Sequence, residues 1–109
     1  MLQDVVGGKT RARVMLYLFA RDSGNATEIA KFFGCSRTAI QNACENLEEG
    51  GILSERSIGT MRVYEFNRQN YFYDELLSLV QKGFSAEEPE LQVRLGIYRG
   101  KPRRKGKEI

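Results

Sequence analysis

Histidine is absent from the 109 residues of this sequence, and cysteine and proline occur only twice each. The lack of histidine removes the commonest general base and the commonest metal ligand at neutral pH. No aspartate or glutamate stands in a recognisable strand-end or loop arrangement of catalytic residues. We therefore expect a protein that is not an enzyme and that has no metal or cofactor site.

The two cysteines are not expected to form a disulfide. Cys35 and Cys44 are nine residues apart, and if one helical segment holds both, they lie about 13 Å apart along its axis. A disulfide requires Cα atoms within about 7 Å of each other. Both side chains are predicted to be reduced, buried thiols that pack as small apolar groups.

Long apolar runs are also missing. No run approaches the roughly 20 residues that span a bilayer, and residues 1–9 lack the basic start and the apolar stretch of a signal peptide. A chain of this length has room for one domain with a modest core. We expect a cytoplasmic protein with no membrane partner.

Positive charge is concentrated at the end of the chain. The sequence has 17 basic and 14 acidic residues, and the segment Lys101–Ile109 alone holds five of the basic residues and one of the acidic ones. The remaining residues therefore carry a net charge of −1. Because this body is nearly neutral, phosphate contacts must come from a local basic patch or from the tail.

Three helices are expected in the first half of the chain. Thr10 is the predicted cap of a helix that runs to about Ala20, and residues 21–24 form a turn. Asn25 and Glu28 resemble a capping box at the start of a second helix, which Gly34 ends. The third helix follows directly after this turn.

Ser36 is the predicted cap of the third helix, which ends at Gly50-Gly51. Its apolar residues recur at i, i+3, i+4 and i+7, so that one face turns inward. These are Ile40, Ala43, Cys44 and Leu47.

Two short segments rich in branched and aromatic residues, Ile52–Arg56 and Met61–Phe66, predict a β-hairpin with Gly59 in its turn. A fourth amphipathic helix is expected over Tyr71–Phe84. The order helix, helix, helix, hairpin, helix predicts an α+β protein that is mostly α, with one domain over residues 9–84.

Residues 85–109 are expected to form a C-terminal extension with a strand and the basic tail. Apolar residues alternate with other residues through Leu91, Val93, Leu95 and Ile97, which is strand periodicity. Because a lone strand is not stable by itself, the segment Leu91–Ile97 must pair with the hairpin edge, pair with a partner chain or remain loose.

The second and third helices have the residues that a helix-turn-helix motif requires: small and apolar side chains at the contact and a glycine in the turn. The stretch Lys9–Lys82 resembles the winged helix-turn-helix domains of the MarR and ArsR families of prokaryotic transcriptional regulators. The resemblance rests on TEIAKFFGCSRTAIQNACENLEEGGILSER and on GTMRVYEFN. It implies a three-helix core, a hairpin wing, an additional C-terminal helix and binding to double-stranded DNA. The alternative is a small helical bundle with a hairpin.

In such domains the N-terminal residues of the third helix are nearest the bases in the major groove. Arg37, Thr38, Gln41 and Asn42 are therefore the predicted base or phosphate contacts, and Ser36 lies at the positive helix end, which favours phosphate. The alternative is that these residues are solvated polar side chains.

The wing is expected to contribute Arg56 and Arg62, which flank the hairpin loop and are placed to contact phosphates or the minor groove, with Thr60 as a lesser contact. Ordinary hairpin charges are the alternative interpretation. The metal-sensing branch of the ArsR family uses clustered cysteines or histidines, and the sequence departs from that pattern.

Regulators of this kind usually pair, so a homodimer through the Tyr71–Phe84 helix or the Leu91–Ile97 segment is expected. The rival function is a winged helix that acts as a protein-interaction adaptor without sequence-specific DNA binding. In that case the near-neutral body contacts a protein, and the basic tail binds an acidic partner. Salt-dependent DNA binding separates the two.

Overall fold

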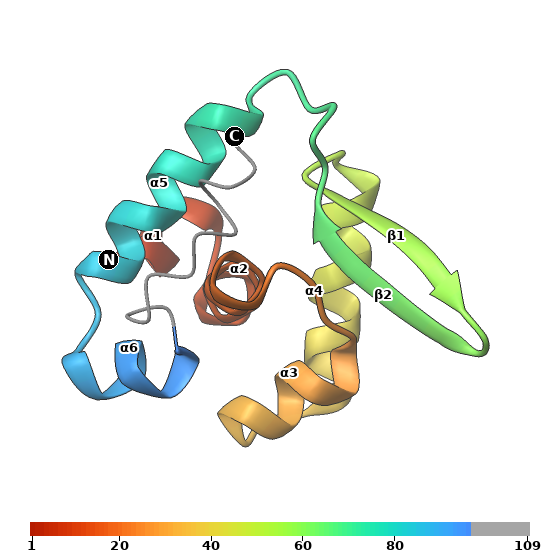
Figure 1. Ribbon diagram of the computed structural model, residues 1–109, viewed down its shortest axis with the longest axis horizontal. Coiled ribbons are helices and arrows are strands. Elements are labelled where there is room, and N and C mark those ends of the chain that lie inside the picture. Colours follow the sequence, from red (N-terminus) through yellow and green to blue (C-terminus); the bar gives the residue numbers. More distant parts are fainter. Residues whose placement is uncertain (97–109) are drawn as a thin grey trace.

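The computed structural model describes residues 1–96, which form six helices and one two-stranded antiparallel hairpin. In chain order the elements are α1 (Leu2–Val6), α2 (Lys9–Arg21), α3 (Ala26–Phe33), α4 (Arg37–Glu49), β1 (Leu53–Ile58), β2 (Met61–Phe66), α5 (Tyr73–Ser85) and α6 (Pro89–Leu95). The predicted α+β class, mostly α, is confirmed (Figure 1). Among these residues, no helix has both the length and the apolar character needed to cross a membrane.

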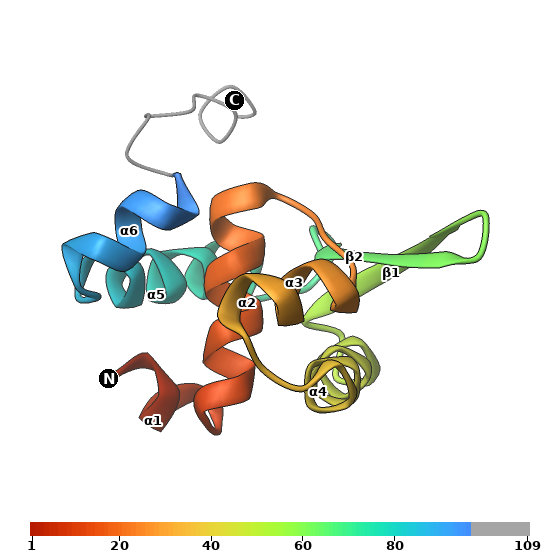
Figure 2. The same cartoon turned by 90° about the horizontal axis from the view of Figure 1, so that it is seen from below.

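Helix α2 is the centre of the fold. All residues from Val14 to Ala20 are buried, and α1, α3, α4 and α5 pack against this helix. Figures 1 and 2 show α5 and α6 on one side of α2, and α3, α4 and the hairpin on the other. The core therefore surrounds α2, and the two sides of the molecule contact each other mainly through it.

The start of α2 differs from the prediction. Gly8, not Thr10, occupies the cap position, and no side chain makes a capping hydrogen bond there. Gly7 and Gly8 have φ values of 103° and 130°, which favour glycine. These two residues turn the chain between α2 and the short helix α1, whose buried Leu2 joins the core. Helix α1 lies outside the predicted domain.

Helices α3 and α4 have the predicted caps. The Asn25 side chain accepts a hydrogen bond from the Glu28 N–H at 2.8 Å, and the Glu28 carboxylate accepts one from the Asn25 N–H at 3.0 Å. Gly34 ends α3 in the left-handed conformation, and the Ser36 hydroxyl accepts from the Ala39 N–H. These bonds satisfy backbone N–H groups that the start of a helix leaves unpaired. They fix where α3 and α4 start.

The hairpin strands pair in a register that places Leu53 opposite Phe66 and Ile58 opposite Met61. The first strand is longer than predicted, so only Gly59 and Thr60 form the turn. Gly59 has φ 65°, which the tight turn requires. At its base, the hairpin is held to the rest of the protein by an isolated bridge between Tyr64 and Gly24.

The loop after the hairpin delays the start of α5. The side-chain amides of Asn67 and Asn70 both donate to the Gly51 carbonyl, at 3.0 and 2.8 Å. The Asn70 side chain also accepts from the Phe72 N–H at 2.7 Å. Helix α5 consequently begins at Tyr73 instead of Tyr71, and it extends to Ser85.

The predicted strand at Leu91–Ile97 is wrong, because residues 89–95 form helix α6. Leu91 and Leu95 are four residues apart and face the core, whereas Val93 is 55% exposed. Pro89 at the first helical position fixes a helical φ. Pairing of this segment as a strand is excluded for residues 89–95, whereas Ile97 and the basic tail lie outside the described residues.

Two arginines hold helix α6 against α2 and α3. Arg21 donates to the carbonyls of Leu95 and Arg94 at 2.9 and 3.2 Å, and Arg94 donates to the Phe32 carbonyl at 2.8 Å. Both guanidinium groups also lie over the Phe32 ring, at 5.5 and 4.5 Å from its centroid. The C-terminal end of α6 is thereby attached to α2 and α3.

Candidate functional site

A groove of about 490 Å³ lies between α3, the N-terminal half of α4 and the hairpin tip. Its lining residues are Asn25, Ala26, Thr27, Glu28, Lys31, Arg37, Gln41, Thr60, Met61 and Arg62. Four of the eight predicted contact residues belong to this lining: Arg37, Gln41, Thr60 and Arg62. Figure 1 shows how the arrangement arises, because the hairpin projects beside α4 instead of folding over it.

The N-terminal end of α4 is open to solvent. Arg37, Thr38 and Asn42 are exposed, as is Ser36 at the cap. The Arg37 Nε donates to the Thr27 hydroxyl at 3.0 Å, which holds the guanidinium at the edge of the groove. An arginine held in this way is exposed and charged, so it is available to an anion.

Gln41 is half-buried instead of pointing outward as predicted. Its side-chain Nε2 donates to the Glu45 carboxylate and to the Tyr64 hydroxyl, each at 3.0 Å. Tyr64 is fully buried and its pKa is raised chiefly by burial, so the hydroxyl stays protonated. Gln41 therefore links α4 to β2, and it is committed to internal hydrogen bonds.

Arg62 is paired with two carboxylates. Its Nη1 lies 3.0 Å from Glu45 Oε2, and its Nε lies 3.2 Å from Glu55 Oε2. Hydrogen bonds from Gln41 and Arg62 lower the pKa of Glu45, so this carboxylate is ionised at neutral pH. The positive charge of Arg62 is thus largely balanced within the protein.

Arg56 does not share this site. In the observed register Arg56 is opposite Val63, and Arg62 is opposite Ser57. Because successive side chains of a strand point to opposite faces, Arg56 and Arg62 lie on opposite faces of the hairpin. Arg56 pairs instead with Glu65, at 3.3 Å. The structure brings Arg62 and Thr60 to the groove and separates Arg56 from it.

Helix α3 supplies groove residues that were not predicted from the sequence. Thr27 and Lys31 are four residues apart on its exposed face, and both line the groove. Lys31, Arg37 and Arg62 are its basic lining residues and Glu28 is its acidic one. The sequence signal for them was the amphipathic pattern of α3, because its polar residues were expected to face solvent.

The described residues include no group of three or more potential ligands that could hold a metal ion. Both cysteines are free thiols, with Cys44 buried and Cys35 partly exposed. Burial, and to a lesser extent Glu45, raises the pKa of Cys44 to about 12. This thiol is therefore protonated at neutral pH.

Comparisons with models of protein families, with curated proteins and with solved structures find no match for this chain.

Proposed function

We propose that this protein binds double-stranded DNA as a winged helix-turn-helix transcriptional regulator. In this proposal α3 and α4 are the helix-turn-helix, the start of α4 enters the major groove, and the hairpin is the wing on the backbone or minor groove. The single observation that carries it is the common groove: residues from the start of α4 and from the hairpin tip, predicted separately from the sequence, face each other across it.

Each side chain has a role that suits its chemistry. Arg37 and Lys31 are exposed cations suited to phosphate. Asn42 and Thr38 are exposed on the first turns of α4 and suited to hydrogen bonds with base edges. Ser36 caps the positive helix end, where phosphate is favoured. Arg62 contributes only by exchanging a carboxylate partner for a phosphate.

Two copies are proposed to act together, because one small domain makes few contacts and paired recognition helices meet successive major grooves. The surface proposed for pairing is the predicted segment Tyr71–Phe84. It begins with Tyr71 and Phe72, which are 90% and 59% exposed and stack edge to face. Sedimentation that gives a monomer both with and without DNA would remove the dimer from the proposal.

The decisive experiment is a fluorescence-anisotropy titration of genomic DNA fragments over a salt series. Arg37→Ala is expected to weaken binding by about tenfold and to reduce the salt slope by about one counterion. Arg68→Ala is the matched control, because it removes one exposed guanidinium from the loop after β2, outside both the groove and the segment proposed for pairing. It should change affinity and slope far less.

The proposal fails if the chain shows no salt-dependent binding, or if the two variants behave alike. A protein-interaction adaptor is the second candidate, favoured by the internal pairing of Arg56 and Arg62 with three glutamates. Binding that survives Arg37→Ala together with Asn42→Ala but is lost on deletion of residues 101–109 would favour this candidate.

A further inference from the structure

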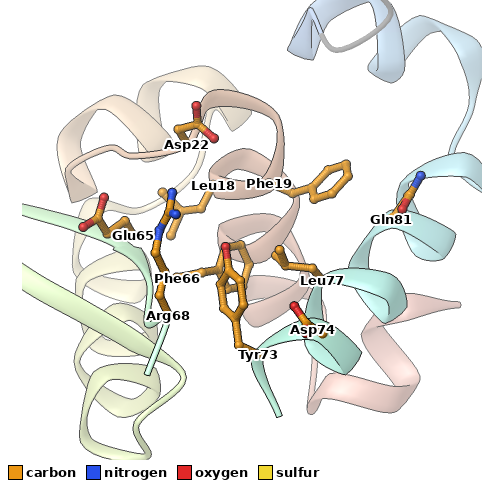
Figure 3. Close-up of a pocket in the computed structure, with 10 residues that line it drawn as sticks. All are labelled: Leu18, Phe19, Asp22, Glu65, Phe66, Arg68, Tyr73, Asp74, Leu77 and Gln81. Atoms are coloured by element: carbon orange, nitrogen blue, oxygen red, sulfur yellow. The ribbon is translucent and has the colours of Figure 1, made fainter. Parts of the chain in front are cut away.

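A second cavity, of about 400 Å³, lies on the other side of β2 from the groove, between the end of α2, the end of β2 and α5 (Figure 3). Its lining residues are Leu18, Phe19, Asp22, Glu65, Phe66, Arg68, Tyr73, Asp74, Leu77 and Gln81. The volume falls in the usual range for small-molecule sites. None of the residues proposed to contact DNA belongs to this lining.

The floor of the cavity is apolar. Leu18, Phe19 and Phe66 are buried residues of the hydrophobic core. Tyr73 and Leu77 are half-buried and form a wall; Figure 3 shows both extending from α5 toward α2. Two aromatic rings in the floor and the Tyr73 ring in the wall favour a ligand with an apolar body, and the faces of such rings attract cations.

The rim of the cavity is acidic. Asp22, Glu65 and Asp74 supply three carboxylates, against one guanidinium from Arg68. Part of the charge of Glu65 is balanced by Arg56, at 3.3 Å. Asp74 lies in the first turn of α5, and its side chain is exposed at the opening. A negative rim around an apolar floor attracts cations and repels anions.

We infer that this cavity binds a small organic cation with an apolar body, such as an aromatic or aliphatic amine. The body lies on Phe19, Phe66 and Leu77, and the ammonium group lies at the rim near Asp74. An apolar anion of equal size makes the same contacts with the floor but is repelled by the carboxylates of the rim. A neutral analogue makes the contacts with the floor and is neither attracted nor repelled by the rim. The order of affinity is therefore set by ligand charge.

The test is an NMR titration of the full chain, labelled with ¹⁵N, without DNA. Three probes share a phenyl ring and a short alkyl chain and differ in charge: phenethylammonium, 2-phenylethanol and 3-phenylpropanoate. Phenethylammonium should shift the amide signals of Phe66, Asp74 and Leu77 in a saturable way. Binding of the alcohol should be about threefold to fivefold weaker, and that of the carboxylate weaker still.

Two variants of the same helical turn locate the ammonium group. Asp74→Asn should weaken phenethylammonium binding by about threefold to fivefold. Glu75→Gln is the matched control, because Glu75 is exposed in the same turn of α5 and does not line the cavity. Its affinity should equal that of the unmodified chain.

The inference is overturned if phenethylammonium gives no saturable shifts at these amides, if the alcohol or the carboxylate binds as well as the cation, or if both variants bind equally. Because no DNA is present, these outcomes are independent of DNA contacts by the groove. The cavity shares Tyr73, Asp74 and Leu77 with the segment proposed for pairing, so the titration is carried out at a protein concentration at which sedimentation gives a monomer.

Discussion

Among single residues, Glu45 holds two of the groove residues, because its carboxylate accepts hydrogen bonds from both Gln41 and Arg62 at 3.0 Å. Glu45→Gln keeps the size of the side chain and removes its charge. If the groove binds DNA, affinity should rise by about threefold, since Arg62 is released and phosphate repulsion falls. The anisotropy titration measures this change.

Glu90→Gln is the control for that variant, because it removes one exposed negative charge from α6, on the other side of α2 from the groove. An affinity for Glu45→Gln that is unchanged or lower, while the affinity for Glu90→Gln is also unchanged, would contradict a role for this groove in DNA binding.

Cys44 makes the free energy of unfolding depend on pH in the alkaline range. Burial raises its pKa in the folded state to about 12, from 9.0. Because the folded state holds the proton more tightly than the unfolded chain, this contribution is complete below about pH 9 and is lost as the pH rises toward 12. The free energy of unfolding in urea should fall above pH 9, by up to about 1.4 kcal/mol per pH unit from this thiol.

Cys44→Ala should flatten this decline. Burial also raises the pKa values of Tyr17 and Tyr64, and since these act in the same direction, part of the decline should persist in the variant. Equal slopes for the two proteins above pH 9 would show that Cys44 makes no such contribution.

Residue positions were predicted from the sequence better than residue partners. The period of α4 placed Thr38 and Asn42 on the exposed face, and the cap identified Ser36. That Gln41 turns inward to Tyr64 depends on how the hairpin packs, which no local pattern encodes. The separation of Arg56 from Arg62 followed from the two-residue turn, because a tight turn sets the register.

At the scale of elements, the attachment of the hairpin depends on Gly24. Its N–H donates to the Tyr64 carbonyl at 3.1 Å, and its carbonyl accepts from the Tyr64 N–H at 2.9 Å. A Cβ added at Gly24 would lie 2.8 Å from Cε1 of Tyr17. Gly24→Ala should therefore lower the free energy of unfolding by about 1–3 kcal/mol, as overpacking does.

Gly50→Ala is the matched control in the same urea experiment. Gly50 has φ −81°, and an added Cβ would lie 3.5 Å from the nearest atom, an ordinary contact. Its effect should stay within about 0.5 kcal/mol. If the two alanine variants are equally stable, the close approach of Gly24 to Tyr17 does not constrain the fold.

The elements that the sequence predicted well have strong local signals at both ends. The box of Asn25 and Glu28, the left-handed Gly34 and the Ser36 cap define α3 and α4. The segment Leu91–Leu95 was misinterpreted because apolar residues at i, i+2 and i+4 fit a strand as well as a helix. Pro89 and the left-handed Gly96 were the helix boundary signals that separate the two. Helix α1 is too short to show a period.

At the scale of the whole molecule, Arg21 connects α2 to a segment more than 70 residues later. It donates to the carbonyls of Arg94 and Leu95, and its guanidinium lies over the Tyr17 and Phe32 rings. Arg21→Ala leaves the last carbonyls of α6 without this donor. Amide hydrogen exchange in residues 91–95 should accelerate by about tenfold, equivalent to about 1.4 kcal/mol of local stability.

Lys82→Ala serves as the control for exchange, because Lys82 is exposed on α5. Exchange within α4 should not change in either variant. Unchanged exchange in α6 after Arg21→Ala would mean that burial of Leu95 alone holds this helix in place.

Tyr64 also restrains the hairpin relative to the helices. Its backbone pairs with Gly24 and its hydroxyl accepts from Gln41, so one buried residue holds the base of the hairpin to two separate parts of the chain. The angle between the hairpin and α4 is thus set during folding. A partner that contacts both elements meets a preorganised surface and loses little conformational entropy on binding. Orientation of the encounter, and not rearrangement of the protein, would then limit the rate of association.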